Sequence, residues 1–215
     1  IASYRKRVVD DLHDPTRAFG FFTFIAATNV VSAMFVGIGL ELPAAVLLAA
    51  AIAAWVVMGY SIPWLAVLSN PRRPILEAAN GTWFIWVVAS QSIAVVAAGI
   101  EPLYPEARQW LAIIAVTTWS MGVMLYAMCG LLLLFRLIMY RLEPQQLDPP
   151  YWITMGAMAI TVVAGARIVE MDDAPMIDVT RALIAGLSVI FWAFATWLIP
   201  ALLAVEVHLG VSTGP

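Results

Sequence analysis

The sequence predicts an all-α integral membrane protein with about six transmembrane helices, and both its composition and its hydropathy pattern indicate this fold class. Of its 215 residues, 63% are hydrophobic and 12% are charged, whereas a soluble domain carries about 25% charged residues. A membrane-spanning helix needs about 20 largely apolar residues. Six segments qualify, and we expect them to form a single transmembrane domain over residues 1–215: residues 19–40, 43–68, 82–100, 110–140, 151–171 and 179–207.

Residues 1–14, which precede the first span, are rich in charge and are interpreted as a loop between helices.

The first two spans differ in polar content. The first span carries amide and hydroxyl side chains at Asn29 and Ser32, whereas the second offers little besides Tyr60 and Ser61. Buried polar groups need partners inside a membrane, so we expect the first span to face other helices and the second to face lipid.

The third span has the most polar centre, and the fourth is mainly apolar. The third begins after Asn80, whose side chain suits a helix cap, and it carries Ser90, Gln91 and Ser92 in its interior. The fourth has its hydroxyl residues near one end and then continues as an apolar run to Phe135. The difference between the first two spans is therefore repeated.

The fifth span combines small residues with hydroxyls. Pro149 and Pro150 suit the first turn of a helix, and Tyr151 and Trp152 favour a membrane–water boundary. At about 100° per residue, one face of this helix carries Thr154, Ala157, Thr161 and Gly165. The threonine hydroxyls either face a cavity or bond back to the preceding turn of their own helix.

A different face of the fifth span is smooth, because it carries Gly156, Ala159 and Ala166. Such a face lets a neighbouring helix approach closely in lipid.

The sixth span is longer than the bilayer requires, and we expect Pro200 to kink it. The odd spans begin near residues 19, 82 and 151, which predicts three helical hairpins, each with a polar inner helix and an apolar outer helix.

Polar residues on the odd spans are candidates for a permeation path. Asn29 and Gln91 either bond to one another between helices or line a watery cavity. Since Lys and Arg are absent from mid-membrane, a solute would be stabilised by amide and hydroxyl dipoles, which suits passage better than tight capture. The predicted pore-lining residues are Asn29, Ser32, Asn80, Gln91, Thr154, Ala157, Thr161 and Gly165.

The distribution of cations predicts the orientation. The loops on one side contain eight of the Lys and Arg residues: Arg5, Lys6, Arg7, Arg17, Arg72, Arg73, Arg136 and Arg141. The other side contains three, Arg108, Arg167 and Arg181, of which Arg167 is expected to pair locally with Glu170. By the positive-inside rule, the chain lies in the cell membrane with both ends in the cytoplasm.

Several classes of function are disfavoured. Cys129 is the only cysteine, and His13 and His208 lie near opposite chain ends, so the pattern suggests neither a metal site nor a cofactor. A net charge of −3 without a basic block gives no sign of nucleic-acid binding. The sequence also shows no nucleophile–base pair or phosphate loop, so we expect no enzymatic activity.

Four motifs resemble the tellurite-resistance/C4-dicarboxylate transporter family, which includes bacterial tellurite-resistance proteins, fungal malate permeases and plant slow anion channels. YWITMGAMAI at residues 151–160 resembles the seventh helix of that family, and NGTW at residues 80–83 resembles the start of the fifth. DP at residues 14–15 resembles the entry to the third helix, and FATWLIP at residues 194–200 resembles the end of the eighth. The likeness extends over essentially the whole chain.

The resemblance implies ten helices arranged as a ring of five hairpins around a central pore, commonly assembled as homotrimers. This chain would supply helices three to eight and lack an N-terminal and a C-terminal hairpin. The implied function is a membrane channel or transporter for small anions or C4-dicarboxylates such as malate, with membrane lipid, the solute and further copies as partners. The alternative is a non-transporting structural subunit of a larger membrane complex, because three hairpins alone leave an open arc.

Overall fold

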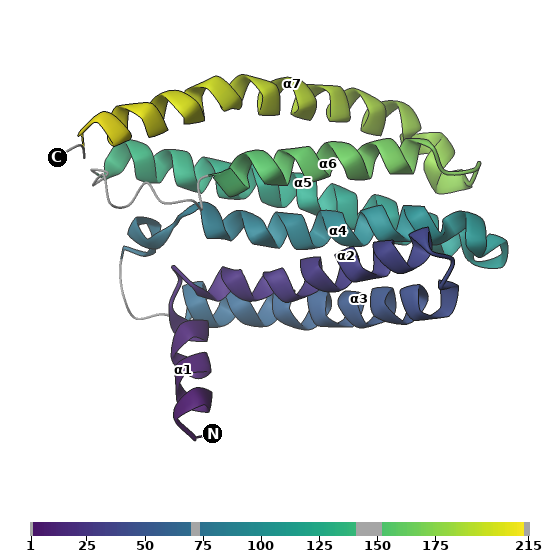
Figure 1. Cartoon of the computed structure of the whole chain (residues 1–215), viewed down its shortest axis with the longest axis horizontal. Helices are drawn as coiled ribbons and strands as arrows, with labels where there is room; N and C mark the ends of the chain where they lie inside the picture. Colours follow the sequence, from purple (N-terminus) through teal and green to yellow (C-terminus); the bar gives the residue numbers. More distant parts are fainter. Residues whose placement is uncertain (1, 70–73, 141–151, 213–215) are drawn as a thin grey trace.

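The computed structural model describes residues 2–69, 74–140 and 152–212, and the regular secondary structure in these ranges is helical (Figure 1). Six helical segments within them are long and apolar enough to cross a membrane. The predicted all-α membrane fold is therefore confirmed. Some residues used in the predictions lie outside the described ranges, namely Arg72, Arg73, Arg141, Pro149, Pro150 and Tyr151.

Each spanning segment contains one long helix, and short 3₁₀ or π turns adjoin several of them. The long helices are α2 (Thr23–Gly37), α3 (Glu41–Pro63), α4 (Phe84–Ile100), α5 (Arg108–Met139), α6 (Trp152–Val169) and α7 (Pro175–Ser212). The short turns are η1 (Ala18–Phe22), the π turn η2 (Trp64–Leu68), η3 (Ile75–Ala78), η4 (Gly81–Trp83), η5 (Glu101–Leu103) and η6 (Pro105–Ala107).

The long helices form the three expected hairpins. α2 packs on α3, α4 on α5, and α6 on α7 (Figure 1). The turn between α2 and α3 passes through Gly39, whose φ of +76° is a conformation that glycine adopts without steric cost. Each polar helix of the sequence pattern thus pairs with the more apolar helix that follows it.

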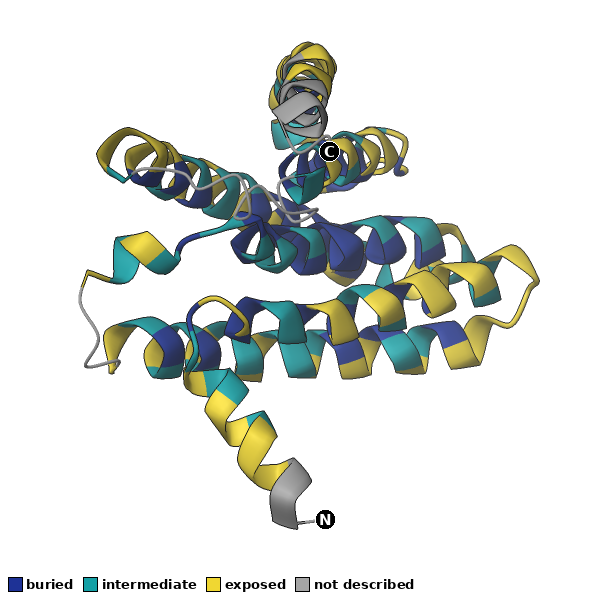
Figure 2. Ribbon diagram, turned by 60° about the vertical axis from the view of Figure 1, so that its left-hand side comes forward, coloured by how far each residue is buried: buried dark blue, intermediate teal, exposed yellow. Residues whose placement is uncertain are grey.

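α4 is the centre of the bundle. It contacts α2 on one side and α6 on the other, and it also contacts α3 and α5 (Figures 1 and 2). Over an apolar stretch of 18 residues in its spanning segment, 72% of the residues are buried, compared with 17–33% in the corresponding stretches of the other five. Small residues such as Ala94, Ala97 and Ala98 allow this close packing.

α7 is longer than the predicted sixth span. It begins at Pro175, four positions earlier than expected, because proline suits the first turn of a helix. It continues through Pro200 as one long curved helix (Figure 1).

Residues 2–13 form a helix, α1 (Ala2–His13), so the loop predicted there is wrong. Val8 and Leu12 lie one turn apart and are partly buried, which gives α1 an apolar side. The helix ends before Asp14-Pro15, where the proline disfavours helical geometry in the preceding residue. α1 runs crosswise to the spanning helices and projects away from them (Figure 1).

Candidate functional site

The polar residues of α2 join it to both of its neighbours. Asn29, which is 1% exposed, donates from Nδ2 to Ser92 Oγ of α4 at 2.9 Å. Ser92 Oγ in turn donates to the Ala89 carbonyl of its own helix at 2.8 Å. Ser32 is fully buried and donates to the Ala44 carbonyl of α3 at 2.8 Å. These bonds fix α2 between α3 and α4.

Gln91 connects α4 to α5. Its Nε2 donates to the Trp119 carbonyl at 3.2 Å, and its side chain is fully buried. The amide packs directly against Gly122 of α5. A Cβ atom at position 122 would overlap Gln91 Nε2, so the glycine makes room for the amide. The two amides therefore do not bond to one another, since Asn29 and Gln91 have different partners.

Trp119 extends this chain of contacts to α6. Its indole Nε1 donates to the Thr161 carbonyl at 3.0 Å. The Thr161 hydroxyl donates to the Ala157 carbonyl one turn earlier at 2.7 Å. The Thr161 hydroxyl thus bonds to its own helix, and the alternative that Thr161 faces a cavity stays a prediction.

Thr154, Ala157, Thr161 and Gly165 of α6 are all buried, whereas Gly156, Ala159 and Ala166 are exposed. Gly165 packs against α7, where a Cβ atom would overlap Ser188 Oγ. The buried face therefore meets other helices of this chain, and the smooth face is open within the described structure.

Asn80 lies near the beginning of α4 and caps the turn η4. Its Oδ1 accepts from the Thr82 backbone N–H at 2.8 Å, which confirms the expected cap. Asn80 Nδ2 and Thr82 Oγ1 both donate to the Thr16 carbonyl, at 3.3 and 3.1 Å. Trp83 Nε1 donates to the Pro15 carbonyl at 2.8 Å. The segment before α2 is thus anchored to the start of α4.

Of the eight predicted pore-lining residues, seven are buried in the bundle and Asn80 is half-buried. Asn29 Oδ1 and Gln91 Oε1 have no hydrogen-bond partner among the described residues. An anion needs donors, and one of the two N–H groups of each of these amides already bonds to Ser92 or Trp119. Whether the eight residues line a path remains a prediction.

At the opposite end of the bundle, a charged cluster joins two hairpins. Glu101 is 1% exposed, and its Oε1 lies 2.5 Å from Arg108 Nε. Arg108 also binds Asp172, after α6, with 2.8 Å between Nη2 and Oδ2. Arg181 of α7 donates to the Val169 carbonyl at the end of α6 and pairs with Asp173.

Sequence reasoning missed the cluster of Glu101, Arg108 and Asp172, because 64 positions separate Arg108 from Asp172 and no spacing rule relates them.

The expected local pair of Arg167 and Glu170 is present, at 3.7 Å between exposed side chains. Exposed pairs of this kind contribute little stability.

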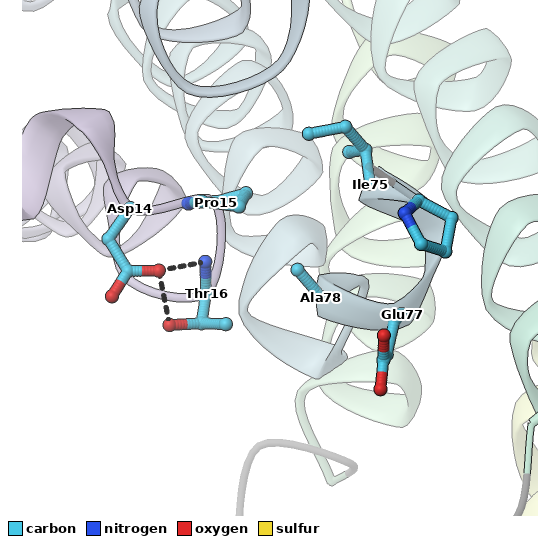
Figure 3. Close-up of a pocket in the computed structure, with 7 residues that line it drawn as sticks. Asp14, Pro15, Thr16, Ile75, Glu77 and Ala78 are labelled. Atoms are coloured by element: carbon cyan, nitrogen blue, oxygen red, sulfur yellow. Dashed lines mark hydrogen bonds between the residues drawn. The ribbon is translucent and has the colours of Figure 1, made fainter. Parts of the chain in front are cut away.

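A pocket of about 300 Å³ lies beside the segment before α2, at the end of the bundle where α4 begins (Figure 3). Asp14, Thr16 and Glu77 line part of it, and Asp14 Oδ1 accepts from the Thr16 backbone N–H at 2.9 Å. Two carboxylates repel an anion. The pocket is therefore a poor anion site.

Comparison with known proteins identifies similar sequences. Residues 1–213 match the family SLAC1, described as voltage-dependent anion channel. Two uncharacterized membrane proteins from two strains of Mycobacterium tuberculosis are each 59% identical over 83 residues, which is 39% of this chain and 42% of each relative. The chain thus spans less than half the length of these curated relatives. No solved structure matches significantly.

Proposed function

Since the chain belongs to the SLAC1 family of voltage-dependent anion channels, we propose that it forms the central part of a conduit for small anions or C4-dicarboxylates such as malate. The family is one of membrane channels or transporters, and this chain is an integral membrane protein with six apolar helices. In the proposal, the solute passes along α2, α4 and α6, which are the inner helices of the three hairpins.

The observation that carries the proposal is the position of α4. It lies between α2 and α6, it is the most buried span, and its interior holds the polar run Ser90-Gln91-Ser92. Buried polar groups in a membrane helix mark a bundle interior or a watery cavity. As lining residues we propose Asn29, Ser32, Asn80, Gln91, Thr154, Ala157, Thr161 and Gly165.

The hydrogen bonds of these residues suggest how an anion would be held. One N–H of each of the Asn29 and Gln91 amides bonds to a neighbouring helix, so an anion competes for that donor with a protein oxygen. Such exchange gives weak, transient binding, which favours passage over capture. The central turns of the three inner helices contain no charged residue that would trap the solute.

We further propose that both ends of this chain lie in the cytoplasm and that additional hairpins and further copies, as a homotrimer, complete the assembly. The cations before α2, including Arg5, Lys6, Arg7 and Arg17, then raise the anion concentration at the inner mouth. Added salt should weaken this attraction.

The proposal is tested by substituting the buried polar residues in the full-length protein. Gln91→Leu and Thr161→Leu should each reduce anion flux into liposomes while the yield of folded protein is retained. Val163→Leu, on the exposed side of α6, is the matched control and should leave flux unchanged. Unchanged flux in both test variants would remove these residues from the path. Absent flux in the unmodified protein would favour a structural subunit.

A further inference from the structure

α1 has the composition and position of a helix that lies on a membrane surface. It projects from the end of the bundle where α2 begins and α3 ends, and it runs crosswise to the spanning helices (Figures 1 and 2). An amphipathic helix in this position lies in the plane of the bilayer interface. Partly buried Leu12 packs against the hydrophobic core, whereas Val9 is 52% exposed.

The exposed charges of α1 are mainly positive. Arg5, Lys6 and Arg7 are exposed and form no ion pair with other described residues. Asp11 is neutralised by Arg17, with 3.1 Å between Oδ1 and Nη1. Asp10 is therefore the only carboxylate of α1 without a cationic partner in the described part of the chain. The helix presents an excess of unpaired positive charge.

An apolar groove lies at this end of the bundle, on α3 and η2. It has a volume of about 560 Å³ and runs along the last turns of α3 and η2, past Val57, Tyr60, Trp64 and Leu68. α1 contacts η2 directly. α1 therefore lies next to η2, whose residues Trp64, Leu65 and Leu68 line one end of the groove.

The aromatic residues of the groove indicate where it lies along the membrane normal. Tyr60 is 78% exposed and Trp64 is 62% exposed, and such rings favour the headgroup layer. The groove thus begins at the headgroups and continues along α3 into the apolar layer. Ser61 adds little polarity, because its hydroxyl donates to the Val57 carbonyl at 2.8 Å.

We propose that α1 and this groove form a docking site for an anionic phospholipid. The acyl chain lies in the groove against Val57, on the apolar side of Tyr60 and Trp64, and the phosphate binds Arg5, Lys6 or Arg7. A free anion satisfies only the cationic half of the site, and a zwitterionic lipid gains little from the positive charge. The site thus selects for a lipid with both an acyl chain and a net negative headgroup.

The test measures the melting temperature of the purified full-length protein in detergent during titration with phosphatidylglycerol. Phosphatidylcholine and inorganic phosphate serve as parallel titrations. Phosphatidylglycerol should raise the melting temperature saturably, and the other two should not. Arg5→Gln, Lys6→Gln and Arg7→Gln should each increase the half-saturating concentration about fivefold, whereas Asp10→Asn should decrease it.

Further variants separate the two halves of the site. Val57→Trp fills the groove and should abolish saturation by phosphatidylglycerol while the melting temperature without lipid is retained. Arg167→Gln, which removes an exposed cation from the end of α6, is the charge-matched control and should leave the titration unchanged.

Three outcomes would overturn the proposal. The first is an unchanged phosphatidylglycerol titration after all three cations of α1 are neutralised. The second is an equal response to inorganic phosphate, which would indicate a soluble-anion site. The third is dissociation of the oligomer in the α1 variants with an intact lipid response, which would assign the surface to a second copy of the chain.

Discussion

The side chain of Gln91 lies directly against Gly122, so that α4 and α5 approach each other where one carries a buried amide and the other carries no side chain. A Cβ atom at position 122 would overlap Nε2 of Gln91, which donates to the Trp119 carbonyl at 3.2 Å. The amide and the glycine therefore depend on each other. This contact fixes the central helix of the bundle to its hairpin partner.

Gly122→Ala should destabilise the protein by about 1–3 kcal/mol, because the added methyl group overfills a close-packed contact. The measurement is reversible unfolding in mild detergent. Gly186→Ala on α7 is the control, since nothing lies within 4 Å of that position, and alanine favours a helix over glycine by up to about 1 kcal/mol. Gln91→Ala should relieve the overlap, so additive effects in the double variant would contradict the contact.

Gly165→Ala should be destabilising by a similar amount, about 1–3 kcal/mol, because its methyl group overlaps Ser188 Oγ of α7. Ser188 Oγ is held in place by its bond to the Ile184 carbonyl at 2.7 Å. Gly156→Ala, on the exposed side of the same helix, has free space and should be tolerated. Equal unfolding midpoints for the Gly165 and Gly156 variants would show that α6 and α7 are not so closely packed.

Asn29→Leu tests the link between the first two hairpins. It removes the bond to Ser92 Oγ at 2.9 Å while the number and branching of the side-chain heavy atoms are retained. The expected loss is about 1 kcal/mol, typical of a hydrogen bond between membrane helices, and it is limited because Asn29 Oδ1 has no partner among the described residues. A double-mutant cycle with Ser92→Ala measures the coupling energy, and zero coupling would exclude the bond.

Glu101→Gln should lower the melting temperature more than Asp172→Asn. Glu101 is buried, so neutralising it removes the partner of Arg108 that is shielded from water. The side chain of Asp172, by contrast, is 66% exposed. Exposed pairs contribute little because water screens them. Thermal unfolding of the two variants compares the contributions directly. A larger effect of Asp172→Asn would place the main contact at the surface.

The helices and hairpins were predictable because they follow from local features. Apolar length predicts each span, and the alternation of polar content between the spans containing Asn29 and Tyr60 predicts which helix of a hairpin is inner. Asn80 was recognisable as a cap, because the cap requires only its own side chain and the N–H of Thr82.

The partners of the polar residues were not predictable, because they depend on how helices rotate against one another. Gln91 faces Gly122 of α5, although both inner and outer helices adjoin α4. The junction of Arg108 with Asp172 joins segments far apart in sequence. The helix α1 was missed because its charge suggested a loop, while the one-turn spacing of Val8 and Leu12 was the signal for an amphipathic helix.

The measurement that tests the central claim most directly is anion flux through liposomes that contain the full-length protein, with chloride, nitrate and malate compared against protein-free liposomes. The proposed function predicts protein-dependent flux of at least one of these anions, which falls in the Gln91→Leu variant. Folded protein that carries none of the three anions would contradict the claim and would favour a structural role in a larger membrane complex.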